Sequence, residues 1–137
     1  MKTMKAVAIV AERKTGILER PIPEIGANQV LVKIHECALC TWEQRVFTRL
    51  VKFPLPFVGG HEMAGEIVQV GSNVDADAYP IGSKVAVRTL PNCGACDSCR
   101  TGNDNICLES FKQTAFDDSV VPGSKDLGGL GQYYCAD

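Results

Sequence analysis

The stretch Cys-Gly-Ala-Cys-Asp-Ser-Cys-Arg-Thr-Gly-Asn-Asp-Asn-Ile-Cys, residues 93–107, decides how this chain is organised. It holds four cysteines, Cys93, Cys96, Cys99 and Cys107, at spacings of three, three and eight. The residues between them are small or polar, so the chain can turn tightly and bring four thiolates around one ion. Four thiolates at about 2.3 Å complete the shell of a tetrahedral Zn²⁺ and leave no position for a substrate, which predicts a structural zinc site. Two disulfides are the alternative, but disulfide scaffolds are usually shorter and richer in cysteine.

The composition is that of an ordinary globular domain. The chain has 137 residues, of which 45% are hydrophobic, and a net charge of −2 without a basic run, which argues against a nucleic-acid partner. The N-terminal apolar run is too short for a signal peptide, and no stretch reaches the roughly 20 apolar residues of a membrane span. Seven cysteines without an export signal favour a reducing cytoplasm, in which thiolates bind metal.

Apolar runs rich in Val and Ile, separated by Gly and Pro turns, predict six short strands. We place them at residues 4–11, 15–20, 29–35, 66–70, 84–88 and 131–135, with a short helix at 41–48. This pattern predicts a mainly β fold, a closed or partly closed barrel with the four cysteines on a long loop. No Gly-x-Gly-x-x-Gly follows a strand and opens a helix, so no nucleotide-binding unit is visible. Because the chain stops just after a strand, we expect it to be part of a longer protein.

A second group of chemistry-bearing residues is Cys40, His61 and Glu62. Twenty-one positions separate the cysteine from the histidine, so only the fold can bring them together. A catalytic zinc usually has three protein ligands and one open position, and these three side chains could supply them. A buried cysteine is often only a small hydrophobe, however, and a lone histidine is often a core residue.

Together the motifs resemble the catalytic domain of the zinc-dependent medium-chain alcohol, polyol and threonine dehydrogenases. The resemblance rests on Gly-His-Glu-Met-Ala-Gly-Glu-Ile-Val-Gln-Val-Gly at 60–71, Val-Leu-Val-Lys-Ile at 30–34 leading into Cys40, Gly-Ser-Lys-Val-Ala-Val at 82–87 and the four cysteines, in this order. It covers nearly the whole chain. It implies a GroES-like, partly open β-barrel over residues 1–137, with a structural-zinc lobe at about 91–108 and the family's Rossmann domain missing.

The resemblance also implies roles for single residues. Cys40 and His61 would be ligands of a catalytic zinc, and Glu62 would be either the third ligand or a neighbouring group. Glu43 matches the position of an aspartate that orients the ligating histidine through its far nitrogen, although a solvated helix carboxylate is the alternative. Two zinc ions per chain are expected, one of them held by Cys93, Cys96, Cys99 and Cys107.

Two positions depart from the family pattern. Members commonly carry a Ser or Thr two residues after the first cysteine and a His five residues after it, whereas this chain has Trp42 and Arg45. Trp42 has no hydroxyl and Arg45 cannot accept a proton, so the usual proton relay is in doubt. Thr41, zinc-bound water or a nearby glutamate could replace it. Trp42 either forms a wall of the substrate pocket or only packs in the core.

The residues and the resemblance lead to one function and one rival. The function is the catalytic portion of an NAD(P)-dependent zinc oxidoreductase, which interconverts an alcohol and a carbonyl compound by hydride transfer. Its expected partners are a small-molecule substrate and its own Rossmann domain, with a cytoplasmic homo-oligomer at full length; the 137 residues alone should be inactive. The rival is a stand-alone zinc module without redox chemistry, for which Cys40, His61 and Glu62 would have no purpose.

Overall fold

The structure is a computed structural model that describes residues 2–88, 92–109 and 128–136. Its elements are β1 (Thr3–Ala11), β2 (Lys14–Pro21), β3 (Val30–Ala38), α1 (Thr41–Phe47), β4 (Glu62–Val70), β5 (Lys84–Ala86), α2 (Asp97–Arg100), the 3₁₀ helix η1 (Asp104–Ile106) and β6 (Tyr133–Ala136). All six predicted strands and the predicted helix are present, although β4 begins earlier and β5 ends earlier than predicted. The predicted lobe boundary at residue 91 and the chain ends at 1 and 137 lie outside the described residues. None of the described helices is long and apolar enough to cross a membrane.

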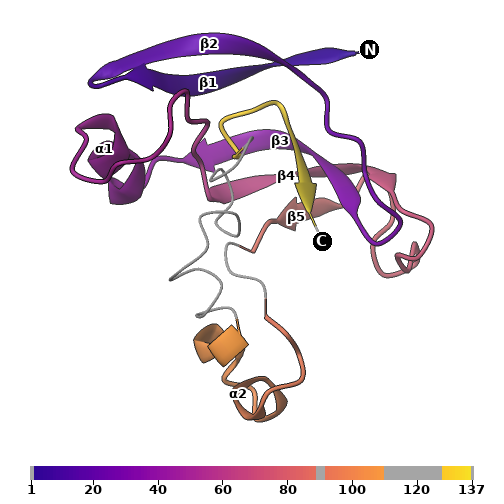
Figure 1. Ribbon diagram of the computed structural model, residues 1–137. Helices are drawn as coiled ribbons and strands as arrows, with labels where there is room; N and C mark the ends of the chain where they lie inside the picture. Colours follow the sequence, from indigo (N-terminus) through magenta and orange to yellow (C-terminus); the bar gives the residue numbers. More distant parts are fainter. Residues whose placement is uncertain (1, 89–91, 110–127, 137) are drawn as a thin grey trace.

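The strands form two antiparallel sheets (Figure 1). One is the β1–β2 hairpin and the other has the order β5-β4-β3-β6. An isolated bridge of Ala6 with Gly131 joins the hairpin to the segment before β6, and one of Ile9 with Phe57 joins it to the segment between α1 and β4. The described strands do not close into a barrel, which agrees with the predicted partly open form. Every strand pair among these residues is antiparallel, so the described part of the chain contains no parallel βαβ unit.

The pairing of β3 with β4 is interrupted by two bulges. The first lies opposite Leu31 and Val32, which are 6% and 1% exposed. The extra residue belongs to β4, while the pairing of β3 with β6 runs without a break over residues 30–33. The second bulge falls at His35, whose side chain is exposed.

The hairpin and α1 share one hydrophobic cluster, formed by Ile9, Val46, Phe53 and Phe57. Phe57 is 4% exposed and belongs to this core. Trp42 packs against the cluster, with its ring edge-on to Phe53 at 5.8 Å between centroids. Its indole Nε1 is buried and has no hydrogen-bond partner among the described residues. Of the two interpretations of Trp42, the structure therefore supports packing.

The unpartnered indole nitrogen gives a prediction for stability. Replacement Trp42→Phe keeps the aromatic contact with Phe53 but removes a buried donor, whose desolvation costs about 1–3 kcal/mol. We expect the free energy of unfolding to stay the same or to rise, whereas Trp42→Ala should lower it by about 2 kcal/mol or more through lost packing. Denaturant unfolding of both variants checks this, and an equal loss in the two variants would mean that the indole N–H has a partner.

Candidate metal centres

The four cysteines of residues 93–107 come together in a small lobe, residues 92–109, which we call the cysteine lobe. It carries α2 and η1 and extends away from the two sheets (Figure 1). The Sγ atom of Cys96 lies 3.5 Å from that of Cys99 and 3.9 Å from that of Cys107, and the Sγ atoms of Cys93 and Cys99 are 3.9 Å apart. Cys107 is buried, whereas Cys93 is exposed. The tight local spacing of the sequence thus produces one compact sulfur cluster.

This cluster has the dimensions of a four-thiolate zinc site. An ion about 2.3 Å from each of four sulfurs in tetrahedral geometry places the sulfurs about 3.8 Å apart. The separations of 3.5 to 3.9 Å fit that value, and they are far longer than the roughly 2.05 Å of a disulfide bond. None of the seven cysteines, all of which lie in the described part of the chain, is joined in a disulfide bond. The donor set leaves no place for a substrate, so its chemistry is that of a structural site.

Without an ion, the four thiols cannot all be thiolates. Partial burial, together with hydrogen bonds to neighbouring cysteines, raises the pKa of Cys99 to about 12. A backbone hydrogen bond involving Cys99 and further hydrogen bonds lower the pKa of Cys96. Metal binding here therefore has to displace protons from the cluster, which makes it more favourable as the pH rises.

The cysteine lobe is connected to the sheet that ends with β5 by one ion pair. Arg88 Nη1 lies 2.5 Å from Asp104 Oδ2, and Asn92 Nδ2 donates a hydrogen bond to the same oxygen at 3.3 Å. The Arg88 guanidinium lowers the pKa of Asp104, so this carboxylate stays ionised well into the acid range. Both side chains are partly exposed, and the pair orients the lobe more than it stabilises the fold.

The second centre forms where β3 and β4 reach the same edge of their sheet. Ala38 at the end of β3 pairs with Glu62 at the start of β4. Cys40 follows the end of β3 and His61 precedes the start of β4, so both residues lie at this edge of the sheet. One donor atom each of Cys40, His61 and Glu62 lies within 4.8 Å of the other two. The fold thus brings together all three predicted side chains, and they fit one metal ion with room for a further ligand.

Glu43 is buried beside this centre and contacts both halves of it. Its Oε2 accepts a hydrogen bond from the Cys40 backbone N–H at 3.0 Å, which caps the start of α1. Its Oε1 accepts a second bond from the Gly60 N–H and lies 3.0 Å from His61 Nδ1. Because a carboxylate can only accept, Nδ1 carries the hydrogen, and the other ring nitrogen, Nε2, has the lone pair that a metal would need. The structure places Glu43 where the predicted orienting carboxylate should be, 7% exposed, and not in solvent.

Two glycines before His61 make these contacts possible, and the sequence analysis did not single them out for this. A Cβ atom on Gly59 would lie 2.9 Å from the Phe57 ring and 3.0 Å from Glu43 Cγ. Gly60 has φ +98°, and its Cβ would lie 2.7 Å from both Cys37 Sγ and the Leu130 backbone N. The consecutive glycines ahead of the histidine were the available signal for this close approach.

Cys37 lies near the second centre but is not among its donors. Burial raises the pKa of its thiol, and the carboxylates of Glu43 and Glu62 add to this effect. A thiol held in the protonated form is a poor nucleophile and a poor ligand.

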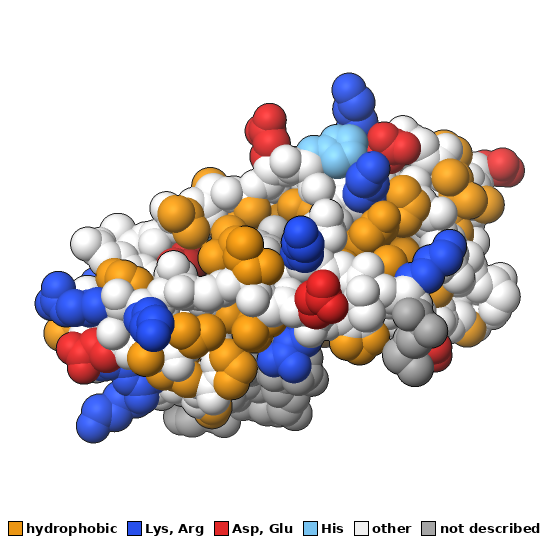
Figure 2. Space-filling view, turned by 90° about the horizontal axis from the view of Figure 1, so that it is seen from above, with side chains coloured by type: hydrophobic (Ala, Val, Ile, Leu, Met, Phe, Trp, Pro, Cys, Tyr) orange, Lys and Arg blue, Asp and Glu red, His pale blue; other side chains and the backbone are white. Residues whose placement is uncertain are grey.

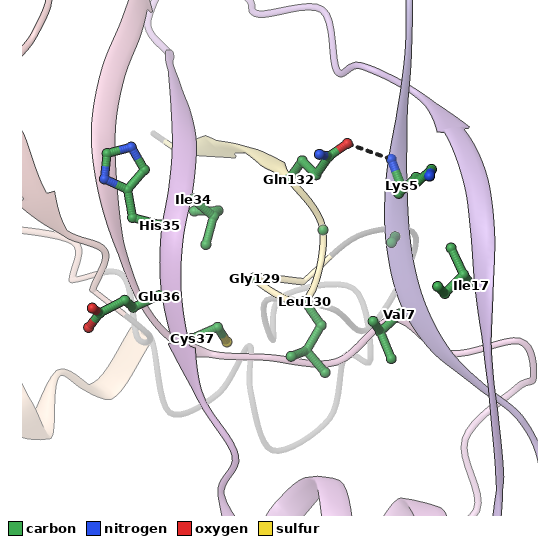
Figure 3. Close-up of a pocket in the computed structure, with 12 residues that line it drawn as sticks. Lys5, Val7, Ile17, Ile34, His35, Glu36, Cys37, Gly129, Leu130 and Gln132 are labelled. Carbon is green, nitrogen blue, oxygen red and sulfur yellow. Dashed lines mark hydrogen bonds between the residues drawn. The ribbon is translucent and has the colours of Figure 1, made fainter.

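A pocket of about 350 Å³ lies next to the second centre but does not include it (Figure 3). It is bounded by β1, β3, Ile17 and the residues 129–132 that precede β6. Ile34 and Cys37 point into it, whereas Cys40, His61 and Glu62 are absent from its lining. The pocket is therefore not where the predicted chemistry would take place.

Comparisons with known proteins identify the family. Residues 26–137 match the model of the alcohol dehydrogenase GroES-like domain. This chain belongs to the zinc-dependent medium-chain dehydrogenase family. It is 36% identical over 110 residues to a sorbitol dehydrogenase of Bacillus subtilis (strain 168), covering 77% of this chain and 31% of the relative. It is 38% identical over 118 residues to an L-threonine 3-dehydrogenase of Chelativorans sp. (strain BNC1), covering 81% and 33%.

A solved structure shows the same fold. The acetophenone reductase from Geotrichum candidum NBRC 4597, solved in complex with NAD, superposes with a TM-score of 0.77 at 27% identity, covering 99% of this chain and 38% of that one. The predicted GroES-like, mainly β fold is thereby confirmed. The chain spans about a third of the length of the curated relatives described above.

The glycine before His61 can be tested against a matched glycine elsewhere. Gly60 and Gly82 have similar positive φ values, +98° and +93°, but a Cβ on Gly82 would meet nothing within 4 Å. Both Gly→Ala variants carry the cost of a left-handed backbone, about 1–2 kcal/mol, and only Gly60→Ala adds the clash with Cys37 and Leu130. We expect Gly60→Ala to lose metal from the Cys40–His61 centre and to unfold more readily than Gly82→Ala. Metal analysis and thermal unfolding of the two variants measure the difference, and equal behaviour would contradict the close packing.

Proposed function

We propose that this chain is the zinc-bearing catalytic portion of an NAD(P)-dependent oxidoreductase that interconverts an alcohol and a carbonyl compound. The observation that carries the proposal is the second centre, in which Cys40, His61 and Glu62 supply three donors around one point. A stand-alone structural module needs only the closed four-cysteine cluster. The second centre supplies three donors, one fewer than a tetrahedral zinc ion binds, which fits a site that receives a substrate oxygen at the fourth position.

The ligands have distinct roles in this proposal. The Cys40 thiolate and His61 Nε2 hold the ion, and Glu62 is the third donor. Zinc in such a site acts as a Lewis acid that lowers the pKa of an alcohol or polarises a carbonyl, while the nicotinamide cofactor, bound by a further domain, exchanges the hydride. The chain's own contribution is to keep the donors in place before the ion arrives.

Glu43 is the positioning residue of the proposed site. Its carboxylate fixes His61 in the tautomer that presents Nε2, and it holds the backbone of Cys40 at the same time. Such hydrogen bonds raise the basicity of a ligating imidazole and restrict its rotation. The buried position of Glu43 strengthens both effects, because little water competes for its oxygens.

The proton of the alcohol needs a path to solvent, and the residues limit the choice. Trp42 is turned into the core and Arg45 has no acceptor atom. The Thr41 hydroxyl lies 3.9 Å from Cys40 Sγ, on the exposed side of α1, and Glu62 is exposed at the start of β4. We assign the outward transfer to the Thr41 hydroxyl, which can pass the proton to solvent on the exposed side of α1.

Metal content tests the proposal directly. The chain should bind two zinc ions, and Cys40→Ser should lower the content to one while leaving the cysteine lobe loaded. Cys99→Ser should lose the ion of the lobe and reduce thermal stability without emptying the second centre. Elemental analysis after dialysis measures both. One zinc per wild-type chain, unchanged by Cys40→Ser, would favour the rival, a zinc module without redox chemistry.

The role of Glu43 gives a further prediction. In Glu43→Gln, one carboxylate oxygen is replaced by an amide NH₂, which cannot accept a hydrogen bond. Either the Cys40 N–H or the donors of Gly60 and His61 then lose their acceptor. We expect metal affinity at the second centre to fall by about 10- to 100-fold. The absorption spectrum of the cobalt-substituted chain should change as well, because the donor geometry changes. Glu36→Gln, an exposed carboxylate on β3, is the matched control. An unaltered spectrum and affinity in Glu43→Gln would remove Glu43 from the site.

A further inference from the structure

Cationic side chains gather at one end of the molecule, formed by the β1–β2 turn, α1 and the segment after it (Figure 2). The backbone N–H of Arg13 in the turn donates to the Phe47 carbonyl at 2.8 Å, which holds the turn against the helix. The cations of these segments are Arg13, Lys14, Arg45, Arg49 and Lys52. Glu12 is the exposed carboxylate of the turn, 3.9 Å from Arg13. This concentration of positive charge stands out in a chain whose net charge is −2.

Arg45 is the free cation of this group that lies nearest to the second centre along the helix. It is exposed, and its side chain forms no ion pair or hydrogen bond with the described residues. Arg49, by contrast, donates to the Phe53 carbonyl at 2.8 Å. A basic residue in the last turn of a helix is favoured by the helix dipole, but this does not account for the other cations in the neighbouring segments.

The position of Arg45 on α1 connects it to the proposed site. Thr41 and Arg45 are four residues apart and therefore neighbours on one helix face, about 5–6 Å between Cβ atoms. Cα–Cβ bonds in a helix tilt toward its N-terminus, so the side chain of Arg45 leaves the backbone in the direction of Thr41. The Thr41 hydroxyl is 3.9 Å from Cys40 Sγ. Arg45, whose guanidinium has no ion pair among the described residues, therefore lies on the exposed face of α1 about one helical turn after the predicted metal ligand Cys40.

We propose that Arg45 binds an anionic group, carboxylate or phosphate, of a substrate whose alcohol or carbonyl oxygen lies at the Cys40–His61–Glu62 centre. The substrate class is therefore an anionic hydroxy or oxo compound, and this inference rests on the proposed function. The guanidinium is suited to the role because it stays charged and donates two parallel hydrogen bonds to either anion. The surrounding cations raise the local concentration of such a substrate.

The test uses the full 137-residue chain with cobalt in the second centre, so that a ligand near the ion changes the absorption spectrum. Matched probes differ only in charge: γ-hydroxybutyrate against γ-hydroxybutyramide, and glycerol phosphate against glycerol. We expect the wild-type chain to bind each anion about tenfold more tightly than its neutral partner, the difference that one charge-assisted hydrogen bond gives. Arg45→Gln should abolish this preference, Arg45→Lys should keep part of it, and Arg13→Gln should keep it nearly whole.

The outcomes separate the inference from the function on which it rests. An anion preference that survives in Arg45→Gln would mean that the anion binds the metal directly, and it would overturn the inference. If Arg45→Gln weakens only the binding of ADP, which carries phosphates like those of the cofactor, the inference is overturned too, because Arg45 would then bind the cofactor. Metal content is measured before any probe is added, so a chain with a single zinc would show that the proposed function itself had failed.

Discussion

One carboxylate, that of Glu43, accepts hydrogen bonds from three donors that belong to two separate parts of the chain. A buried charge is costly unless it is well paired, so the folded chain gains from keeping the Cys40 and Gly60 N–H groups and the His61 ring in place around it. The same contacts fix the helix start, the turn before β4 and the direction of the imidazole. Local structure and the second metal centre therefore depend on one side chain.

The two centres could be predicted from the sequence to different degrees. The cysteine lobe follows from local spacing alone, because all its donors lie within residues 93–107. The second centre depends on the register between β3 and β4, which the hydrophobic periodicity of the sequence does not encode. Its residues were predicted from the resemblance to the family instead. The structure then places Cys40, His61 and Glu62 together, with Glu43 behind them.

Other features were accessible only in three dimensions. The bulge opposite Leu31 and Val32 interrupts the β3–β4 register at a point where no Gly or Pro marks it in the sequence. The inward packing of Trp42 depends on Phe53, which lies on a different segment, and the close approach of Gly59 to Glu43 depends on tertiary contacts. In each case the deciding neighbour is distant in sequence, so local propensity carries no information about it.

The compactness of the cysteine lobe has a consequence for the order of assembly. Closing a short loop costs little chain entropy, so its four thiolates can gather around an ion while most of the chain is still unfolded. Cys40 and His61 become neighbours only after β3 and β4 have paired, which is a slower, non-local step. The donors of the cysteine lobe can therefore assemble early in folding, whereas those of the second centre come together only in a nearly complete domain.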